Sequence, residues 1–151
     1  MPEVAVRPDE REVARAEVEA ILAAARDDAY RGELGALALA IDTGELDETE
    51  AAALERVLEL ALQAGRIRAV YGPGGEQAAL RLYRRLPAGA ALQESARSVT
   101  TALASFAGRS FDGARLEAVG PGAFSLALTA GGVEISIRLD RSGARLASVG
   151  V

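Results

Sequence analysis

Alternation of apolar and polar residues in the last third of the chain predicts an antiparallel β-meander. Two alternating segments, residues 123–130 and 133–140, flank Gly131-Gly132. This two-residue loop suits a primed hairpin turn because both glycines accept positive φ. Closing the turn creates four apolar pairs on one face. The pairs are Ala130 with Val133, Leu128 with Ile135, Leu126 with Ile137, and Phe124 with Leu139.

Two further turns extend the same apolar face. We expect Arg141-Ser142-Gly143 to form a three-residue loop that pairs Asp140 with Ala144. Upstream, we expect a second three-residue loop at residues 120–122. The pairs that follow are Ala147 with Ile137, Val149 with Ile135, Val151 with Val133, Leu116 with Leu126, and Ala118 with Phe124. A slip of one residue would break this face, so the register is well specified.

The opposite face of the meander carries few long charged side chains. Its predicted rows are Ser125, Arg138 and Leu146; Ala127, Ser136 and Ser148; and Thr129, Glu134 and Gly150. Either the face is open and weakly polar, or a second copy or another protein covers it. The candidate interaction residues are Ser125, Ser136, Arg138, Leu146 and Ser148.

Helical periodicity before the meander predicts four or five helices. Their expected extents are from the N-cap Asp9 to about Tyr30 with Gly32 as a stop, then residues 33–41, 47–65, 76–86 and 90–107. Asp47 and Glu50 have the spacing of a capping box. The alternating residues 66–71 are instead expected to form a strand, placed either at an edge of the meander or elsewhere.

Together these elements predict an α+β fold. N-terminal helices, within about residues 9–107, pack on one face of a C-terminal four-stranded antiparallel β-meander, about residues 114–151. We find no fixed-period repeat and no low-complexity linker, and we therefore expect a single domain over residues 1–151.

Composition removes several kinds of chemistry. The chain of 151 residues has no cysteine and no histidine, and all 17 basic residues are arginine. These absences exclude thiolate nucleophiles, Cys- or His-based metal sites, Ser-His-Asp triads and Schiff-base lysines. We therefore name no catalytic residue, metal or cofactor and expect a protein without enzymatic activity. High alanine and arginine content without lysine is typical of a high-GC bacterium, and no secretory signal or membrane span is visible, which suggests a cytoplasmic protein.

Charge is unevenly distributed along the chain. Residues 1–65 hold 16 acidic residues and 6 arginines, whereas residues 66–151 hold 6 acidic residues and 11 arginines. The two parts either complement each other within one fold or face different partners.

A glycine-rich segment followed by a helix is the most suggestive local motif. Gly72-Pro73-Gly74-Gly75 could present backbone N–H groups to an anion, but it lacks the lysine of a phosphate-binding loop. Arginines cluster around it. The candidate anion or partner patch comprises Arg66, Arg68, Arg81, Arg84, Arg85, Gly74 and Gly75. Salt bridges to the acidic helices are the competing interpretation, and the acidic net charge argues against nucleic-acid binding.

Two function classes remain open. The first is a protein-interaction or assembly module, with a homodimer as one form. The second is a small-ligand pocket between helices and sheet, which could be enzymatic. Its candidate lining residues are Tyr71, Tyr83, Phe124 and Leu126. The acidic run at residues 42–50 does not have calcium-loop spacing, and helix capping explains Asp47 and Glu50 more simply.

Overall fold

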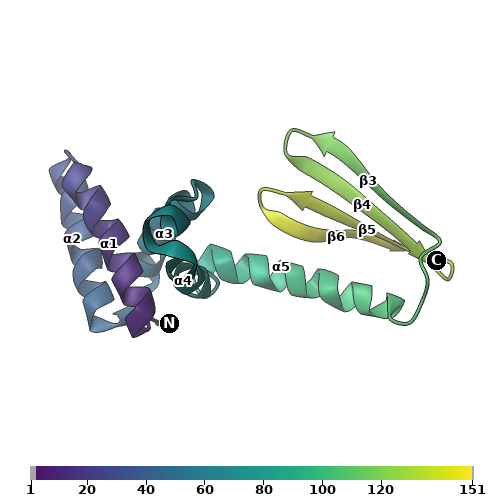
Figure 1. Ribbon diagram of the computed structural model, residues 1–151, viewed down its shortest axis with the longest axis horizontal. Helices are drawn as coiled ribbons and strands as arrows, with labels where there is room; N and C mark the ends of the chain where they lie inside the picture. Colours follow the sequence, from purple (N-terminus) through teal and green to yellow (C-terminus); the bar gives the residue numbers. More distant parts are fainter. Residues whose placement is uncertain (1–2, 151) are drawn as a thin grey trace. The chain divides into compact units, whose positions relative to one another are not determined.

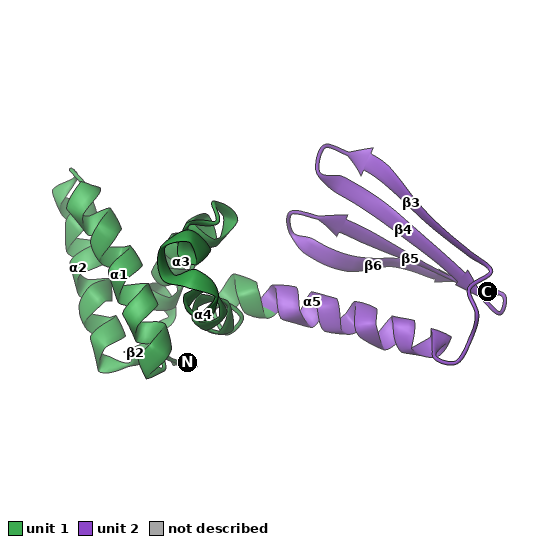
Figure 2. Cartoon of the chain, viewed as in Figure 1, with its two compact units in different colours: residues 1–90 green, residues 91–151 purple. Residues whose placement is uncertain are grey.

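Helices form the first part of the chain and a four-stranded antiparallel sheet the last part, which confirms the predicted α+β class (Figure 1). The structure is a computed structural model that describes residues 3–150. The chain divides into two compact units, residues 1–90 and residues 91–151 (Figure 2). The division falls within helix α5 (Pro87–Leu103). The single domain expected from the sequence stays a prediction.

The first unit packs four helices around one apolar core. They are α1 (Pro8–Ala24), α2 (Asp28–Thr43), α3 (Glu48–Gln63) and α4 (Arg66–Tyr83), with a small antiparallel pair formed by β1 (Val4–Ala5) and β2 (Glu45–Leu46). Helix α1 contacts the other three helices. Fully buried side chains from each helix meet in the core, among them Val18, Ile41, Leu54, Leu58 and Leu82.

The helix boundaries differ from the prediction near the N-terminus. The expected N-cap Asp9 lies inside α1, because Pro8 occupies the first helical position, where its missing N–H costs nothing. The helix also ends at Ala24 and not near Tyr30. Asp27 caps a new helix there by accepting a hydrogen bond from the Tyr30 N–H at 2.7 Å. Gly32 is therefore a residue of α2 and not a stop.

The capping of α3 matches the sequence. The Glu50 N–H donates to Asp47 Oδ1 at 2.8 Å, and the Asp47 N–H donates to Glu50 Oε2 at 2.8 Å. This reciprocal pair is the predicted capping box. It gives two residues of the acidic run a structural role.

The prediction of a strand at residues 66–71 is wrong, because this segment is the first part of α4. Six alternating residues fit a strand, but Ile67 and Tyr71 are four apart and thus share a helix face. Ile67 is fully buried in the core, and Tyr71 packs against it. Gly72 interrupts the helix with φ 72° and ψ −175°, and Pro73 begins its second part. The predicted helix at 76–86 therefore begins earlier and ends at Tyr83.

The second unit consists of most of α5, a 3₁₀ turn η1 (Ala104–Phe106), and four strands in the order β3-β4-β5-β6. The strands are β3 (Gly113–Gly120), β4 (Ala123–Ala130), β5 (Val133–Asp140) and β6 (Gly143–Gly150). Val99 and Phe106 pack on Ala130, Ile135 and Ile137. Pro87, which follows the helix predicted at 76–86, is the first residue of α5.

The central register of the meander is as predicted. All four pairs between β4 and β5 are present, and both Gly131 and Gly132 have positive φ. The pairs Leu116–Leu126, Ala118–Phe124 and Val149–Ile135 are also confirmed. Val151 lies outside the described residues.

The two outer turns are tighter than expected. Asp140 pairs with Gly143, so the loop has two residues, and Ile137 faces Leu146 instead of Ala147. A bulge at Ala147 then restores the expected pairing of Ser136 with Ser148. Gly120 likewise pairs with Ala123 after a bulge at Val119, which shortens the predicted three-residue loop. A bulge adds one residue to a strand, and alternation does not distinguish it from a longer loop.

Within residues 3–150, none of the helices combines the length and the apolar character that crossing a membrane requires.

Candidate functional site

Two carboxylates of α1 are buried in the first unit. As whole residues, Glu10 and Glu17 are 0% and 2% exposed. They lie seven residues apart, about two helical turns, and therefore occupy the same side of α1. Each is bonded to an arginine contributed by α4 or by the residues that directly follow it. Buried charges are tolerated only when they are paired in this way.

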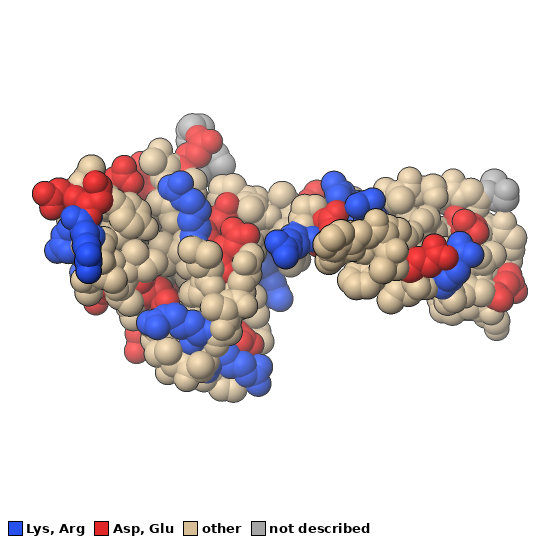
Figure 3. Space-filling view, turned by 90° about the horizontal axis from the view of Figure 1, so that it is seen from above, with Lys and Arg blue, Asp and Glu red and all other residues tan. Residues whose placement is uncertain are grey.

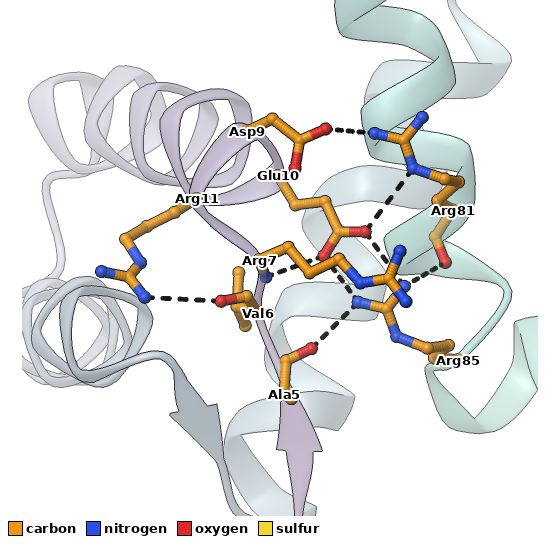
Figure 4. Close-up of polar contacts among 8 residues, drawn as sticks. All are labelled: Ala5, Val6, Arg7, Asp9, Glu10, Arg11, Arg81 and Arg85. Atoms are coloured by element: carbon orange, nitrogen blue, oxygen red, sulfur yellow. Dashed lines mark hydrogen bonds and ion pairs between the residues drawn. The ribbon is translucent and has the colours of Figure 1, made fainter.

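Glu10 receives hydrogen bonds from two directions (Figure 4). Arg85 Nη1 donates to Oε1 at 3.0 Å and Nη2 to Oε2 at 2.6 Å. The Arg7 N–H donates to Oε2 at 2.9 Å. Burial alone raises the pKa of Glu10, but the bonds from Arg85 and Arg7 outweigh it and leave the pKa below its usual value. Arg85 also donates to the carbonyls of Ala5 and Arg81 at 2.9 and 3.0 Å, and so it joins β1, α1 and α4.

Glu17 forms the second buried cluster. The Tyr71 hydroxyl donates to its Oε1 at 2.8 Å, and Arg66 Nε lies 3.1 Å from its Oε2. Burial raises the pKa of Tyr71 to about 12, and the adjacent Glu17 carboxylate adds to the effect.

The geometry of both clusters suits the attachment of α4 to α1 better than proton transfer. A carboxylate with a lowered pKa is a weak base at neutral pH, and a phenol of pKa about 12 is a weak acid. Sequence reasoning did not single out Glu10 or Glu17. The available signal was their spacing, since both fall in one stripe with Val13, Ala14 and Val18.

Most arginines of the predicted patch form ion pairs with acidic residues of the first unit. Arg66 bonds Glu17, Arg85 bonds Glu10, Arg68 Nη1 lies 3.3 Å from Glu76, and Arg81 pairs with Asp9 and stands 3.9 Å from Glu10. Acidic and basic side chains are accordingly interspersed over the helical unit (Figure 3). The competing interpretation, salt bridges to the acidic helices, describes Arg66, Arg81 and Arg85, whereas Arg68 pairs with Glu76 within α4 itself. Arg84 directly follows α4 and is exposed.

The glycine-rich segment belongs to the kink of α4. Gly75 sits so close to Tyr71 that a Cβ at this position would overlap the Cβ of Tyr71, whereas a Cβ at Gly74 would meet nothing within 4 Å. Both glycines and Tyr71 line a hollow of about 280 Å³, which Asp9 and Glu12 also border. Carboxylates at its rim disfavour an anion.

A larger cavity of about 660 Å³ opens beside the Glu10 cluster. Its volume lies within the range of small-molecule sites. It is lined by Glu3, Val4, Ala5, Arg7, Glu48, Ala51, Arg85, Pro87 and Ala90. The sequence did not indicate this cavity, because its walls come from β1, the start of α3 and the start of α5.

The sheet of the second unit has an apolar face that one helix covers in part. Leu116, Phe124, Leu146 and Val149 are 59%, 42%, 39% and 58% exposed. Each pairs across the sheet with a residue of the second core: Leu126, Leu139, Ile137 and Ile135, respectively. Cross-strand partners share a face, so the four exposed side chains lie on the apolar face, on both sides of the part that α5 covers.

The opposite, outer face keeps four of the five predicted interaction residues. Ser125 pairs with Arg138 and Ser136 with Ser148, as expected. Leu146 is the exception, because the tighter turn moves it opposite Ile137. Arg145 takes its place beside Arg138, and Asp140 contacts both guanidinium groups, at 2.6 Å from Arg145 and 3.4 Å from Arg138. Hydrogen bonds from Ser142, together with Arg145, lower the pKa of Asp140 to about 2.

The residues predicted to line a pocket lie in different units. Tyr71 and Tyr83 pack against the helical core, and Leu126 packs against the core of the sheet unit, where Phe124 is exposed. Among residues 3–150, no three acidic side chains gather as metal ligands.

Comparison with known proteins found no match among protein-family models, curated proteins or solved structures.

Proposed function

We propose that this protein is a non-enzymatic protein-interaction or assembly module whose contact surface is the sheet of the second unit. The observation that carries the proposal is the set of four large exposed hydrophobic side chains, Leu116, Phe124, Leu146 and Val149, on the apolar face. Exposed apolar side chains that continue a buried face mark sites of association. In the view of Figure 3, uncharged residues also cover much of the surface of this unit.

The residue types of the first unit support the same proposal. Its two buried carboxylates are bonded to arginines, and these bonds hold helices together. The chain also has no cysteine, histidine or lysine for nucleophilic or acid–base work. The bacterial and cytoplasmic setting expected from composition stays a prediction.

The test compares substitutions on the two faces of the sheet. Phe124→Asp places a charge on the apolar face, and Ser136→Arg places one on the outer face. We expect native mass spectrometry of the full chain to show an assembly that Phe124→Asp weakens and Ser136→Arg leaves intact. Circular dichroism should show both variants folded with thermal midpoints close to the parent, because Phe124 is half exposed.

The opposite pattern would assign assembly to the outer face. If Phe124→Asp unfolds the protein while the parent is monomeric, the chain itself covers this surface, and the proposal is wrong.

The alternative function is binding of a small ligand in the 660 Å³ cavity of the first unit. Apolar side chains of Val4, Ala51 and Pro87 line it beside charged Arg7 and Glu48. The same native mass spectra separate the two functions. A monomer that carries the mass of a small molecule, and loses it on Ala90→Phe at the cavity wall, would favour the ligand-binding alternative.

A further inference from the structure

Strand β3 is an edge of the sheet with an unpaired side. Among residues 3–150, β3 is hydrogen-bonded to β4 alone, and all eight residues from Gly113 to Gly120 are exposed. A regular exposed edge presents free N–H and C=O groups to another strand. The other edge, β6, is interrupted by the bulge at Ala147, and bulges disfavour edge pairing. The pairing of β3 with β4 is regular from Gly113 to Ala118.

The sequence of β3 is complementary to itself in the antiparallel direction. Arg115 and Glu117 flank Leu116, and Ala114 and Ala118 lie one position further out. A two-fold axis perpendicular to the sheet at Leu116 places Arg115 of each copy opposite Glu117 of the other. It also places Leu116 opposite its own counterpart. Opposite charges and matching apolar residues directly across an antiparallel pair are stabilising.

We propose that β3 pairs antiparallel with β3 of a second copy, centred on Leu116, and forms a continuous eight-stranded sheet. This inference rests on the proposed assembly function and names its partner as the same chain. The symmetry is that of a two-fold dimer, in which one patch contacts itself. This two-fold axis keeps the apolar faces of both copies on the same side of the joined sheet. It also brings together the exposed apolar side chains of the two copies, which include Leu116 and Phe124.

Neighbouring registers are worse for electrostatic reasons. A two-fold axis at Glu117 would place that carboxylate opposite itself, and an axis at Arg115 would place two guanidinium groups together. Like charges directly opposite each other destabilise a strand pair. Within one copy Arg115 Nε already lies 3.1 Å from Glu117 Oε1, so both side chains stand on the same, outer face. The dimer adds two further pairs between copies at low desolvation cost, because all four groups stay at the surface.

Charge reversal tests this register directly. In an Arg115→Glu dimer, the new glutamate at position 115 of each copy faces Glu117 of the other copy. In a Glu117→Arg dimer, the new arginine at position 117 of each copy faces Arg115 of the other. We expect each variant alone to raise the dimer dissociation constant about tenfold, since two attractive pairs become repulsive. Analytical ultracentrifugation over a micromolar to millimolar concentration series measures this constant, and circular dichroism checks that each variant is folded.

Mixing the two variants is the decisive experiment. A heterodimer of Arg115→Glu with Glu117→Arg pairs opposite charges at both positions, so dimerisation should return. Native mass spectrometry identifies the heterodimer by its mass, which equals that of the parent dimer. The double variant Arg115→Glu/Glu117→Arg, with both charges exchanged in one chain, should dimerise like the parent.

Three results would overturn the pairing. They are a parent that stays monomeric at the highest concentration, single variants that dimerise like the parent, and a mixture that fails to form heterodimers. A dimer insensitive to the β3 charges but lost in Phe124→Asp would reject the β3 pairing alone and leave the proposed assembly function standing. If neither the β3 variants nor the face variants change any assembly, both proposals fail.

Discussion

At the scale of single residues, the first unit contains carboxylates that are buried in its core. Glu10 is fully buried, and its carboxylate is held by Arg85 and by the Arg7 N–H. Replacing one member of a buried pair leaves the other without compensation, which costs more than the intact pair contributes. Arg85 is one-third exposed and can recover some hydration.

We expect Glu10→Gln to lower the free energy of unfolding by about 2–3 kcal/mol, somewhat less than for a fully buried pair. Glu19→Gln is the matched control on the same helix, because Glu19 pairs with Arg15 at the surface, and its loss should cost less than about 0.5 kcal/mol. Urea denaturation followed by circular dichroism measures both. Equal effects of the two substitutions would contradict the structural role of Glu10.

The pH dependence of this effect has a definite sign. The pKa of Glu10 is lowered on folding, so its contribution is fully present above the unfolded carboxyl pKa of about 4.3 and is lost as pH falls through the folded value. The difference between the parent and Glu10→Gln should therefore shrink below about pH 4.

At the scale of the secondary-structure elements, the kink in α4 links a glycine to the second buried cluster. Gly72 adopts positive φ, and the second part of the helix then passes close to Tyr71, whose hydroxyl bonds Glu17. Gly75 permits this approach, since any Cβ there would overlap Tyr71. The glycines predicted to cradle an anion thus have a packing role at Gly75.

The pair Gly75→Ala and Gly74→Ala isolates this packing role. We expect Gly75→Ala to destabilise the protein by about 1–3 kcal/mol, because Tyr71 must move. Gly74→Ala should be neutral or stabilising by up to about 1 kcal/mol, because alanine favours the helix and meets no neighbour. Thermal unfolding distinguishes the two. A stable Gly75→Ala protein would show that the backbone of α4 adjusts freely.

At the scale of the whole molecule, residues 3–150 form two hydrophobic cores. The buried members of the first core all come from residues 6–86, and those of the second from residues 99–137. A unit with its own core can in principle fold alone. The first unit holds 17 acidic residues against 11 arginines, whereas the second holds 5 against 6.

We therefore expect a fragment of residues 1–90 to fold by itself, with a helical circular dichroism spectrum and a cooperative thermal transition. The full chain, measured under the same conditions, is the control. A fragment without a cooperative transition would show that the helices need the sheet unit, and it would support the single domain expected from the sequence.

The sequence by itself determined the fold class, the capping of α3, and the central register of the meander. These features depend on neighbouring residues: Asp47 and Glu50 are one helical turn apart, and Gly131-Gly132 joins the strands that it aligns. Local interactions and a strict two-residue period leave few alternatives there.

Only the tertiary structure decided the rest. Residues 66–71 alternate like a strand but are helical, because Ile67 and Tyr71 complete a core built by distant helices. Arg85 lies 75 residues from Glu10 and Arg66 lies 49 residues from Glu17, and no local pattern reveals such pairs. The exposure of Leu116, Phe124, Leu146 and Val149 likewise depends on how much of the apolar face of the sheet α5 covers. Each of these features is set by contacts between segments far apart in the chain, where local propensity is overridden by burial.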